Sequence, residues 1–506
     1  MKRIRARSLL ALALLAAACR TGPPTPARPL VIAVPWELDT LDPHAKNFVA
    51  TFAVVSQFYE PLVSTDAEMH LQPCLASRWE NPDPSTWVFH LRRNVVFHGG
   101  KPLRAEDVVY TIERLLTDNT LEMGGYVLYI ASVRARDDYT VEIRTQRPVS
   151  VLLNKLRFVE IIPKGSAPGL LATRPDGTGP YRLATWKGNE MKLAVNERYW
   201  GIKPEVPRVD LHLARSPDAA LAELLGGRAQ LVLCPSKARA AALSPDRFRI
   251  RRRPNIFVKY MSYDLARDET PYCSARPNPF KDPRVREAID LAIDRRALIA
   301  GLPTEAVPAS QLVPPFIFGY DSKIPESRPD LPRARELMAQ AGLQAGFDVT
   351  LDVRRIFTDA ALLVAAALRP IGIRVTLRVA SDKEFFARMD RRDSTFHLSR
   401  FGCLTGDLSD ILDNALHTPD PQRHFGIHNY VGYSNPDVDR AIEESSRIQA
   451  INTRRNALQK ISEMLVKDRV WIPLYVDEDV YALDRRLEWQ PRNDGLILAA
   501  DIRLAR

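Results

Sequence analysis

The residues of this chain that could perform chemistry do not form a familiar catalytic motif. The sequence lacks HExxH, GxSxG, a phosphate-binding P-loop and a GxGxxG between a strand and a helix. His90 and His98 flank the end of a candidate strand without a third ligand at a spacing that suits a metal. Glu106 and Asp107 fit the first turn of a helix, where acids favour the helix dipole, and Cys403 has no activating base near it in sequence. We therefore predict a protein that is not an enzyme and that uses no metal or cofactor.

The segments that must position such residues alternate between strand and helix patterns. Period-two or β-branched runs predict strands, and apolar residues three or four apart predict helices. The strand-helix-strand order over 347–379 predicts an α/β architecture with largely parallel sheets. The expected strands are 30–34, 86–93, 347–353 and 373–379, and the expected helices are 105–116, 282–299, 332–343 and 359–369.

Length and composition place the chain among globular proteins with a sizeable core. It has 506 residues, of which 45% are hydrophobic and 26% charged, so roughly three domains of about 150 residues are expected. The formal net charge is +10, but the basic residues are dispersed without a long Lys/Arg run. We therefore predict no nucleic-acid partner.

The N-terminus has the pattern of an export signal. Four basic residues precede an apolar run over 9–18 that is too short to span a bilayer, for which about 20 residues are needed. Residues 15–19, LAAAC, resemble a bacterial lipobox, with Ala16 in place of the usual Leu. We predict that residues 1–18 are a signal peptide, that Cys19 is lipidated, and that the Pro-rich stretch 19–28 links this anchor to a soluble body. An ordinary signal peptide with a chance cysteine is the alternative.

Short motifs follow one another in a fixed order along almost the whole mature chain. In that order they resemble family 5 of the extracellular solute-binding proteins, the peptide/nickel-type receptors of ABC importers. The block at 87–115 is the most specific of them. The motifs are DTLDPHA (39–45), FYEPLV (58–63), LQPCLASRWE (71–80), WVFHLRRNVVFHGGKPLRAEDVVYTIERL (87–115), GTGPYRLATW (177–186), NERYWG (196–201), FKDPRVREAIDLAIDRRALI (280–299) and ARELMAQAGLQAGFDVTL (334–351).

This resemblance implies a bilobal α/β fold of the type II periplasmic-binding-protein kind, with an additional inserted domain and a hinge. Lobe I would comprise 29–70, 173–264 and 473–506, the inserted domain 71–172, and lobe II 265–472. Two segments that cross between the lobes would form the hinge. The ligand would lie in the cleft between the lobes.

The resemblance also implies ligand-binding residues. In receptors of dipeptides and oligopeptides, the loop that matches 396–413 carries an Asp that pairs with the peptide ammonium, and Asp407 matches it; a solvated loop acid or a helix cap is the alternative. Arg400, Arg354 and Arg355 fall near arginines that bind the ligand carboxylate, unless they form surface ion pairs. Tyr59 and Glu60 would line the cleft or pack at the hinge. Leu404 and Ile411 depart from the aromatic and the proline usual in this loop, which leaves strict peptide specificity open.

A disulfide between Cys273 and Cys403 is implied by a bridge joining similar regions in oligopeptide receptors, and export permits it. Cys74 and Cys234 would then be free buried thiols. We expect a monomer, anchored by lipid to the bacterial membrane on the periplasmic or cell-envelope side. It would capture a small zwitterionic solute, foremost a short peptide, and deliver it to an ABC permease. The alternatives are a binding protein that works with a membrane sensor, or a receptor for a nickel chelate, glutathione, an opine or an oligosaccharide.

Overall fold

A single mixed sheet runs through both halves of the molecule. The computed structural model describes residues 29–234 and 236–505. The sheet has eleven strands in the order β15-β14-β16-β12-β17-β11-β1-β10-β9-β8, with β13 paired to β17. Their bounds are β1 Leu30–Val34, β8 Tyr181–Lys187, β9 Glu190–Val195, β10 Arg208–Leu213, β11 Leu231–Leu233, β12 Phe248–Tyr263, β13 Ala306–Pro308, β14 Phe347–Arg354, β15 Ile373–Ala380, β16 Phe396–Gly402 and β17 Trp471–Asp484.

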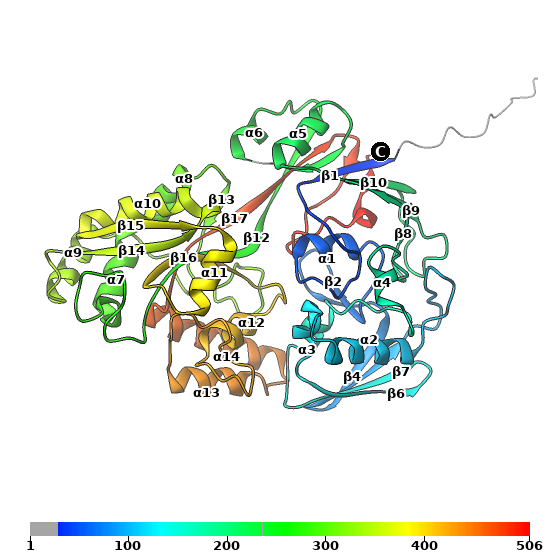
Figure 1. Cartoon of the computed structure of the whole chain (residues 1–506), viewed down its shortest axis with the longest axis horizontal. Coiled ribbons are helices and arrows are strands. Elements are labelled where there is room, and N and C mark those ends of the chain that lie inside the picture. Colours follow the sequence, from blue (N-terminus) through cyan, green and yellow to red (C-terminus); the bar gives the residue numbers. More distant parts are fainter. Residues whose placement is uncertain (1–28, 235, 506) are drawn as a thin grey trace, which may run out of the picture.

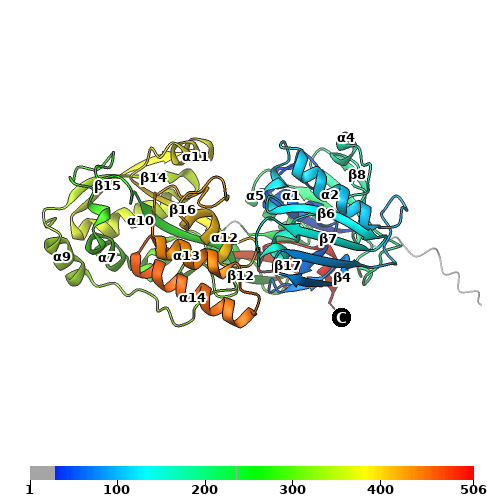
Figure 2. The same cartoon turned by 90° about the horizontal axis from the view of Figure 1, so that it is seen from below.

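Two long strands of this sheet, β12 and β17, connect the two halves. They pair antiparallel from Phe248 opposite Asp484 to Ser262 opposite Trp471, with breaks in register after Pro254 and after Lys259. Figures 1 and 2 show both strands passing through the middle of the molecule, from the half with α7 and α9 to the half with β1 and β10. Because the register breaks lie where the halves join, they are the places where the ladder can bend.

The half that contains β1 also carries a second sheet, which is entirely antiparallel. Its order is β4-β5-β7-β6, and helix α2 lies beside it (Figure 2). The elements of this half outside the large sheet are α1 Val49–Val55, β2 Val63–Thr65, β3 Leu71–Pro73, β4 Ala76–Asp83, β5 Thr86–Leu91, α2 Ala105–Thr117, β6 Ile130–Asp137, β7 Thr140–Thr145, α3 Leu152–Leu156, α4 Pro168–Leu171, α5 Pro217–Leu225, α6 Lys237–Ala241, β18 Leu487–Glu488 and β19 Arg503–Leu504.

The other half is rich in helices that pack around β14, β15 and β16. Helix α14 is the longest at 18 residues and lies beside α13 at the lower edge (Figure 1). The helices are α7 Pro283–Ala292, α8 Arg295–Gly301, α9 Leu331–Gln340, α10 Thr358–Leu368, α11 Asp382–Asp390, α12 Ser409–Ile411, α13 Pro436–Ser445 and α14 Ile451–Asp468.

Separate hydrophobic cores underlie these parts. One core draws its residues from 62–161, around Phe89, Phe97 and Ile112. A second lies around Ile32, Tyr181 and strand β10. Two more occupy the half with the helices: one under β14 and α7, the other under α14. The residue boundaries given above for the lobes and the inserted domain stay a prediction; we keep those names for the stated ranges.

Most predicted elements are confirmed, and two predictions are wrong. Every expected strand and helix exists within a few residues of its predicted bounds. The segment 282–299, however, is two helices, because Asp294 accepts hydrogen bonds from the backbone N–H groups of Arg296 and Ala297 and caps a new helix there. The sheet is also not largely parallel: only β1 with β10 and β11, and β14 with β15 and β16, pair in parallel. The hinge strands β12 and β17 supply antiparallel pairing.

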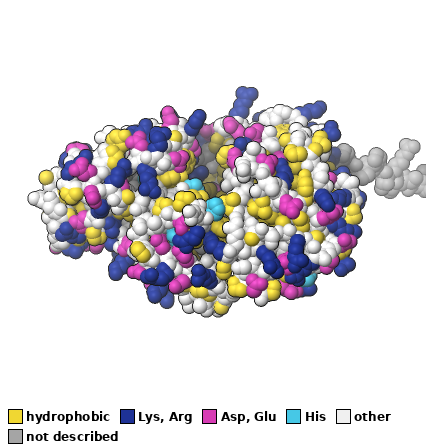
Figure 3. All heavy atoms as spheres, turned by 60° about the horizontal axis from the view of Figure 1, so that its bottom comes forward, with side chains coloured by type: hydrophobic (Ala, Val, Ile, Leu, Met, Phe, Trp, Pro, Cys, Tyr) yellow, Lys and Arg dark blue, Asp and Glu magenta, His cyan; other side chains and the backbone are white. Residues whose placement is uncertain are grey.

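The surface bears charges of both signs close together. In Figure 3, basic and acidic side chains are interspersed over the face shown, and the molecule is hollowed between its two halves. Among the helices of the described residues, none combines the length and apolarity needed to cross a bilayer. Cys19 and the predicted signal peptide and linker lie outside the described residues.

Candidate functional site between the lobes

The loop after β16 brings lobe II into contact with the inserted domain. The side-chain amide of Asn154 donates to the carbonyl of Thr405 at 2.8 Å, and Arg157 Nη1 donates to the carbonyl of Leu404 at 3.2 Å. Asn154 belongs to α3, and Arg157 follows this helix directly. These two contacts place the boundary between the lobes at residues 403–413.

A narrow pocket of about 20 Å³ lies at this boundary and is lined from all three parts of the chain. Phe52 and Leu496 come from lobe I, Tyr126 and Arg157 from the inserted domain, and Leu404 from lobe II. A pocket this small does not hold a dipeptide.

Arg157 is one of the cations at this boundary. It is buried, and its Nη2 donates to Oδ2 of Asp494 at 3.0 Å. Burial lowers the pKa of Arg157, and Asp494 opposes this effect. Arg492 also binds Asp494, at 2.9 Å, so the shared carboxylate has two cationic partners. Arg157 and Arg492 thus share one carboxylate, and Asp501 lies 3.6 Å from Arg492 as well.

Two acids of lobe II face the same boundary. Burial raises the pKa of Asp413 to about 6, and it also raises the pKa of Asp410. Lys155 of α3 lowers both pKa values from across the boundary, and Arg147 lowers that of Asp413. The interlobe boundary thus holds positive groups on the inserted domain and acidic groups on lobe II, an arrangement that suits a ligand with charges of both signs.

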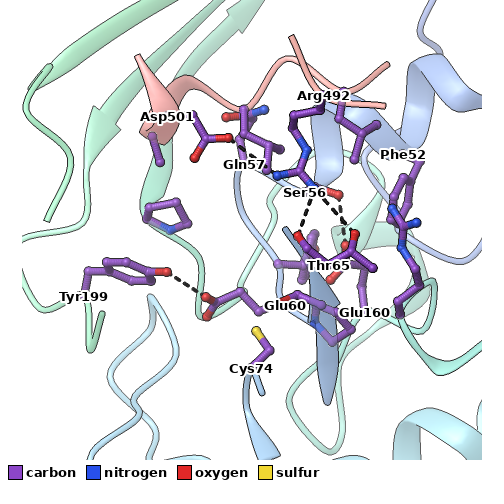
Figure 4. A pocket seen from close by; sticks show the side chains of 18 of the residues that line it. Phe52, Ser56, Gln57, Glu60, Thr65, Cys74, Glu160, Tyr199, Arg492 and Asp501 are labelled. Atoms are coloured by element: carbon purple, nitrogen blue, oxygen red, sulfur yellow. Dashed lines mark hydrogen bonds and ion pairs between the residues drawn. The ribbon is translucent and has the colours of Figure 1, made fainter. Parts of the chain in front are cut away.

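A larger chamber of about 290 Å³ lies behind Arg157, between lobe I and the inserted domain. Figure 4 shows Glu60, Cys74 and Glu160 on one side of it and Arg492 and Asp501 on the other. Burial raises the pKa of Glu60 to about 7 and that of Glu160 to about 8, so both carboxyls titrate near neutral pH.

Two of the predicted site residues, Tyr59 and Glu60, line this chamber. The ring of Tyr59 is fully buried in the core of lobe I, and burial raises the pKa of its hydroxyl. Glu60 accepts hydrogen bonds from Thr178 at 2.7 Å, from Tyr199 at 2.8 Å and from Trp200 at 2.7 Å. The structure therefore brings this pair together with Glu160, away from the predicted residues of lobe II.

Asp407 has a cationic partner within the chain. Its carboxylate accepts from Arg454 Nη1 at 2.6 Å and Nη2 at 2.8 Å, and from the hydroxyl and backbone N–H of Ser409. Arg454 thus already balances the carboxylate that the family resemblance assigns to a ligand ammonium. Asp407 still lines an interlobe groove of about 440 Å³, so a role at the ligand stays a prediction.

The predicted arginines of lobe II differ in exposure: Arg354 is buried, Arg400 is half-buried and Arg355 is exposed. Arg354 pairs with Asp382 at the start of α11, while Arg400 stacks on the ring of Phe257 at 4.2 Å. Both guanidinium groups also approach the ring of Phe357, at 5.3 and 5.9 Å. Burial lowers the pKa of Arg400, and Arg354 lowers it further.

Strand pairing adds one more cation to this side of lobe II. Lys259, which is fully buried and pairs with Asp477, lies opposite Arg400 in the register of β12 and β16. Arg355 is exposed in the short turn after β14 and is not part of the cluster. The cationic cluster thus consists of Arg354 and Arg400 of lobe II and Lys259 of the hinge strand β12.

The predicted disulfide between Cys273 and Cys403 is wrong in this structure, where both thiols are free and buried. Cys273 packs in the core beneath β14, whereas Cys403 packs in the core beneath α14, where its thiol donates to the carbonyl of Asp407. The two cysteines belong to different cores of lobe II. Cys74 and Cys234 are free and buried, as predicted.

Sequence reasoning missed Arg157, Glu160, Arg454 and Asp494. Arg454 is 47 residues from its partner Asp407, and Arg157 is 337 residues from Asp494. No local spacing connects such pairs. The unusual placement of a charged residue inside the apolar stretch 158–162 is the one signal that could have identified Glu160.

No metal centre accompanies these groups. Within the described residues, no cluster of three or more His, Cys, Asp or Glu side chains has a geometry that could hold a metal ion. Nε2 of His98 donates to the carbonyl oxygen of Gly179 at 3.0 Å. His90 lies 3.0 Å from Glu80, on the exposed side of β5.

Known proteins resemble the chain over nearly its full length. The family model for bacterial extracellular solute-binding proteins, family 5, matches residues 70–422. The glutathione-binding protein GsiB of Salmonella choleraesuis is 27% identical over 497 residues, which cover 94% of both chains.

Solved structures share the fold. HbpA2 from Haemophilus parasuis superposes with a TM-score of 0.84 at 22% identity, covering 95% of this chain and 100% of that one. DppA from Helicobacter pylori, a periplasmic binding protein associated with an ABC transporter and solved with the peptide STSA, gives a TM-score of 0.77 at 23% identity over 94% and 98% of the two chains. The predicted bilobal α/β fold is confirmed.

Proposed function

Because the chain belongs to family 5 of the bacterial extracellular solute-binding proteins, whose members bind solutes and are not enzymes, we propose that it is the receptor of an ABC importer for a small zwitterionic solute, foremost a short peptide. The solute enters between the lobes and the lobes close over it by bending at β12 and β17. The closed form then docks onto the membrane permease.

The observation that carries this proposal is the distribution of charge across the interlobe boundary. Lys155 on the inserted domain acts on both Asp410 and Asp413 of lobe II, and Arg147 acts on Asp413, while Arg157 lines the narrow pocket at the same boundary. Both acids have raised pKa values because burial deprives them of water. The carboxylate of a zwitterion would face the cations of the inserted domain, and its ammonium would face the acids of lobe II. Each charge would then gain a partner at a boundary that contains little water.

Relatives support the solute class. GsiB is named for glutathione, which is a tripeptide, and the DppA structure holds the peptide STSA. A peptide exposes a carboxylate that Arg157 or the cluster of Arg354, Arg400 and Lys259 could bind. Its backbone could be held by hydrogen bonds that do not depend on the side chains.

Lipid anchoring through Cys19 completes the proposal. The lipobox-like stretch 15–19 and the Pro-rich linker 19–28 support it. A diacylglycerol on the cysteine would keep the receptor near its permease on the outer side of the cytoplasmic membrane, or on another membrane of the cell envelope.

The test is to purify the protein from its source without denaturation and to identify the solute that comes with it by mass spectrometry. Calorimetry with that solute and with glutathione, Ala-Ala and a nickel–histidine chelate then ranks the classes. A peptide that binds with micromolar or better affinity and is recovered uncleaved supports the proposal. Preferential binding of the chelate, or hydrolysis of the peptide, would contradict it.

A further inference from the structure

The chamber between lobe I and the inserted domain holds two buried carboxyl groups that form no ion pair. Glu60 is 7% exposed and Glu160 only 1%. Among the residues that the structure describes, neither is within ion-pair distance of a Lys or Arg side chain. Oε2 of Glu160 is buried without a hydrogen-bond partner, while its Oε1 accepts from Ser56 at 3.1 Å. An unpartnered carboxylate oxygen that lines a cavity calls for a donor in that cavity.

The nearby arginines are already engaged. Arg92 Nε donates to the carbonyl of Cys74 at 2.6 Å, and its guanidinium stacks on Trp200. Arg157 and Arg492 both bind Asp494. Arg157 and Arg492 are thus paired with an acid, and Arg92 with a carbonyl and a ring. Among the described residues, Glu60 and Glu160 accept hydrogen bonds from neutral donors only.

The chamber continues into the interlobe pocket. Phe52, Arg157 and Leu496 line both spaces. A group that enters between the lobes can thus extend past Arg157 toward Glu160. With a volume of about 290 Å³, the chamber has room for a small aliphatic amine or for one end of a larger solute.

We propose that this chamber binds a primary ammonium group, held between the carboxylates of Glu60 and Glu160. The ammonium has three donors, which match the two lone pairs on the free oxygen of Glu160 and the one that Glu60 keeps beside its three hydrogen bonds. A metal ion fits less well, because no group of three ligating side chains is present among the described residues. If the ammonium is one end of the captured solute, this proposal rests on the function proposed above. If it belongs to a free small amine, that amine is a second ligand.

The pKa values of these carboxyls, raised by burial to about 7 and about 8, mean that an ammonium must displace protons at neutral pH. Arg92 lowers the pKa of Glu60 and Arg157 lowers that of Glu160, whereas the charge of Glu60 raises the pKa of Glu160. Burial raises the pKa of Cys74 and Tyr199, and it lowers that of His44, whose Nε2 is 2.8 Å from the carbonyl oxygen of Glu160, to about 4.

Asp501 is the remaining acid of the chamber. Burial raises its pKa, and Arg492 lowers it from 3.6 Å away. Since Arg492 faces Asp501, this acid is not left without a cation as Glu60 and Glu160 are.

The experiment uses the purified full-length mature protein and two pairs of probes. The first pair is n-butylammonium and its neutral analogue n-butanol; the second is Ala-Ala and N-acetyl-Ala-Ala. Calorimetry compares wild type, Glu160→Gln and the control Glu106→Gln, which changes an exposed glutamate of the same domain. Gln keeps the size of Glu160 and can still accept from Ser56.

We expect butylammonium to bind wild type and the control alike, and Glu160→Gln at least about tenfold more weakly, since a charge-assisted hydrogen bond is lost. Binding to wild type should strengthen from about pH 6 to about pH 8.5 as the carboxyls lose protons. This measurement on wild type tests the proposal even if the variant is unstable.

The two sources of the ammonium give different results. If Ala-Ala also depends on Glu160 and on a free amino group, the ammonium belongs to the imported solute. If only butylammonium depends on Glu160, the chamber takes an independent amine, and a failure of Ala-Ala to bind counts against the peptide receptor alone. Absence of amine binding, equal binding of butanol, or equal affinity in Glu160→Gln would each overturn the chamber proposal.

Discussion

Arg454 of α14 holds Asp407 of the loop after β16 through two hydrogen bonds of 2.6 and 2.8 Å, and both side chains are buried. The loop after β16 contacts the inserted domain, and this pair binds the loop to α14, the longest helix of lobe II. Asp407 therefore has a structural task that is independent of any ligand.

This pair predicts a loss of stability when one partner is removed. Asp407→Ala leaves the guanidinium of Arg454 buried and uncompensated, which typically costs about 3–5 kcal/mol in the free energy of unfolding. The double variant Asp407→Leu with Arg454→Met should recover much of that loss, because no lone charge is left. Urea unfolding measures both. A loss below about 1 kcal/mol in Asp407→Ala would show that the pair is not formed.

A second prediction concerns the dependence of stability on pH. Because the pKa of Glu160 rises from its ordinary value to about 8 on folding, the folded protein binds a proton at this site more tightly than the unfolded chain. This contribution to stability is complete below the ordinary pKa of a glutamate, and it is lost as the pH rises through about 8.

Glu160→Gln removes that dependence, so the fall in the free energy of unfolding between about pH 5 and pH 8 should be shallower than in wild type. Denaturant titrations at several pH values measure the slope. Glu106→Gln, at an exposed site, should retain the wild-type slope. A slope for Glu160→Gln that equals that of wild type would refute the raised pKa.

A third prediction follows from the free thiols. Cys273 and Cys403 should both be alkylated in unfolded protein that was never reduced, and both should be protected in the folded protein because they are buried. Mass spectrometry of the alkylated peptides distinguishes the two states. A Cys273–Cys403 peptide linked by a disulfide would restore the bridge that the family resemblance implied.

These corrections show what local sequence can and cannot convey. The strands and helices around 347–380 were predictable because their periodicity is local, and the helix break at Asp294 was in principle visible as a capping residue. The partners of Asp407 and Arg157 were not, because each lies far along the chain and is set by how lobes pack. The family motifs identified the loop that contains Asp407, but they did not reveal that Arg454 balances its charge.

The fourth prediction tests the anchor. Cys19→Ser removes the thiol that would be acylated, so the protein should move from the membrane fraction to the soluble fraction of the cell envelope. Fractionation followed by immunoblotting measures the shift, and Cys234→Ser, at a buried thiol outside the N-terminus, serves as the control. Retention of Cys19→Ser in the membrane fraction would argue against lipidation.

The last prediction separates the two roles of Arg157, in the structure and at the ligand. Arg157→Met removes the cation at the interlobe boundary, yet Asp494 keeps Arg492, which donates to both of its carboxylate oxygens at 3.0 and 2.9 Å. We therefore expect a loss of stability smaller than that of Asp407→Ala, in which Arg454 is left without its acidic partner.

If the carboxylate of the solute binds Arg157, the affinity of Arg157→Met for the solute should fall at least about tenfold. A ligand amidated at its C-terminus should bind wild type and variant equally. Calorimetry with the co-purified solute measures this, with Arg134→Met on the exposed face of β6 as the control. Unchanged affinity in Arg157→Met would indicate that the solute carboxylate binds instead at the cluster of Arg354, Arg400 and Lys259.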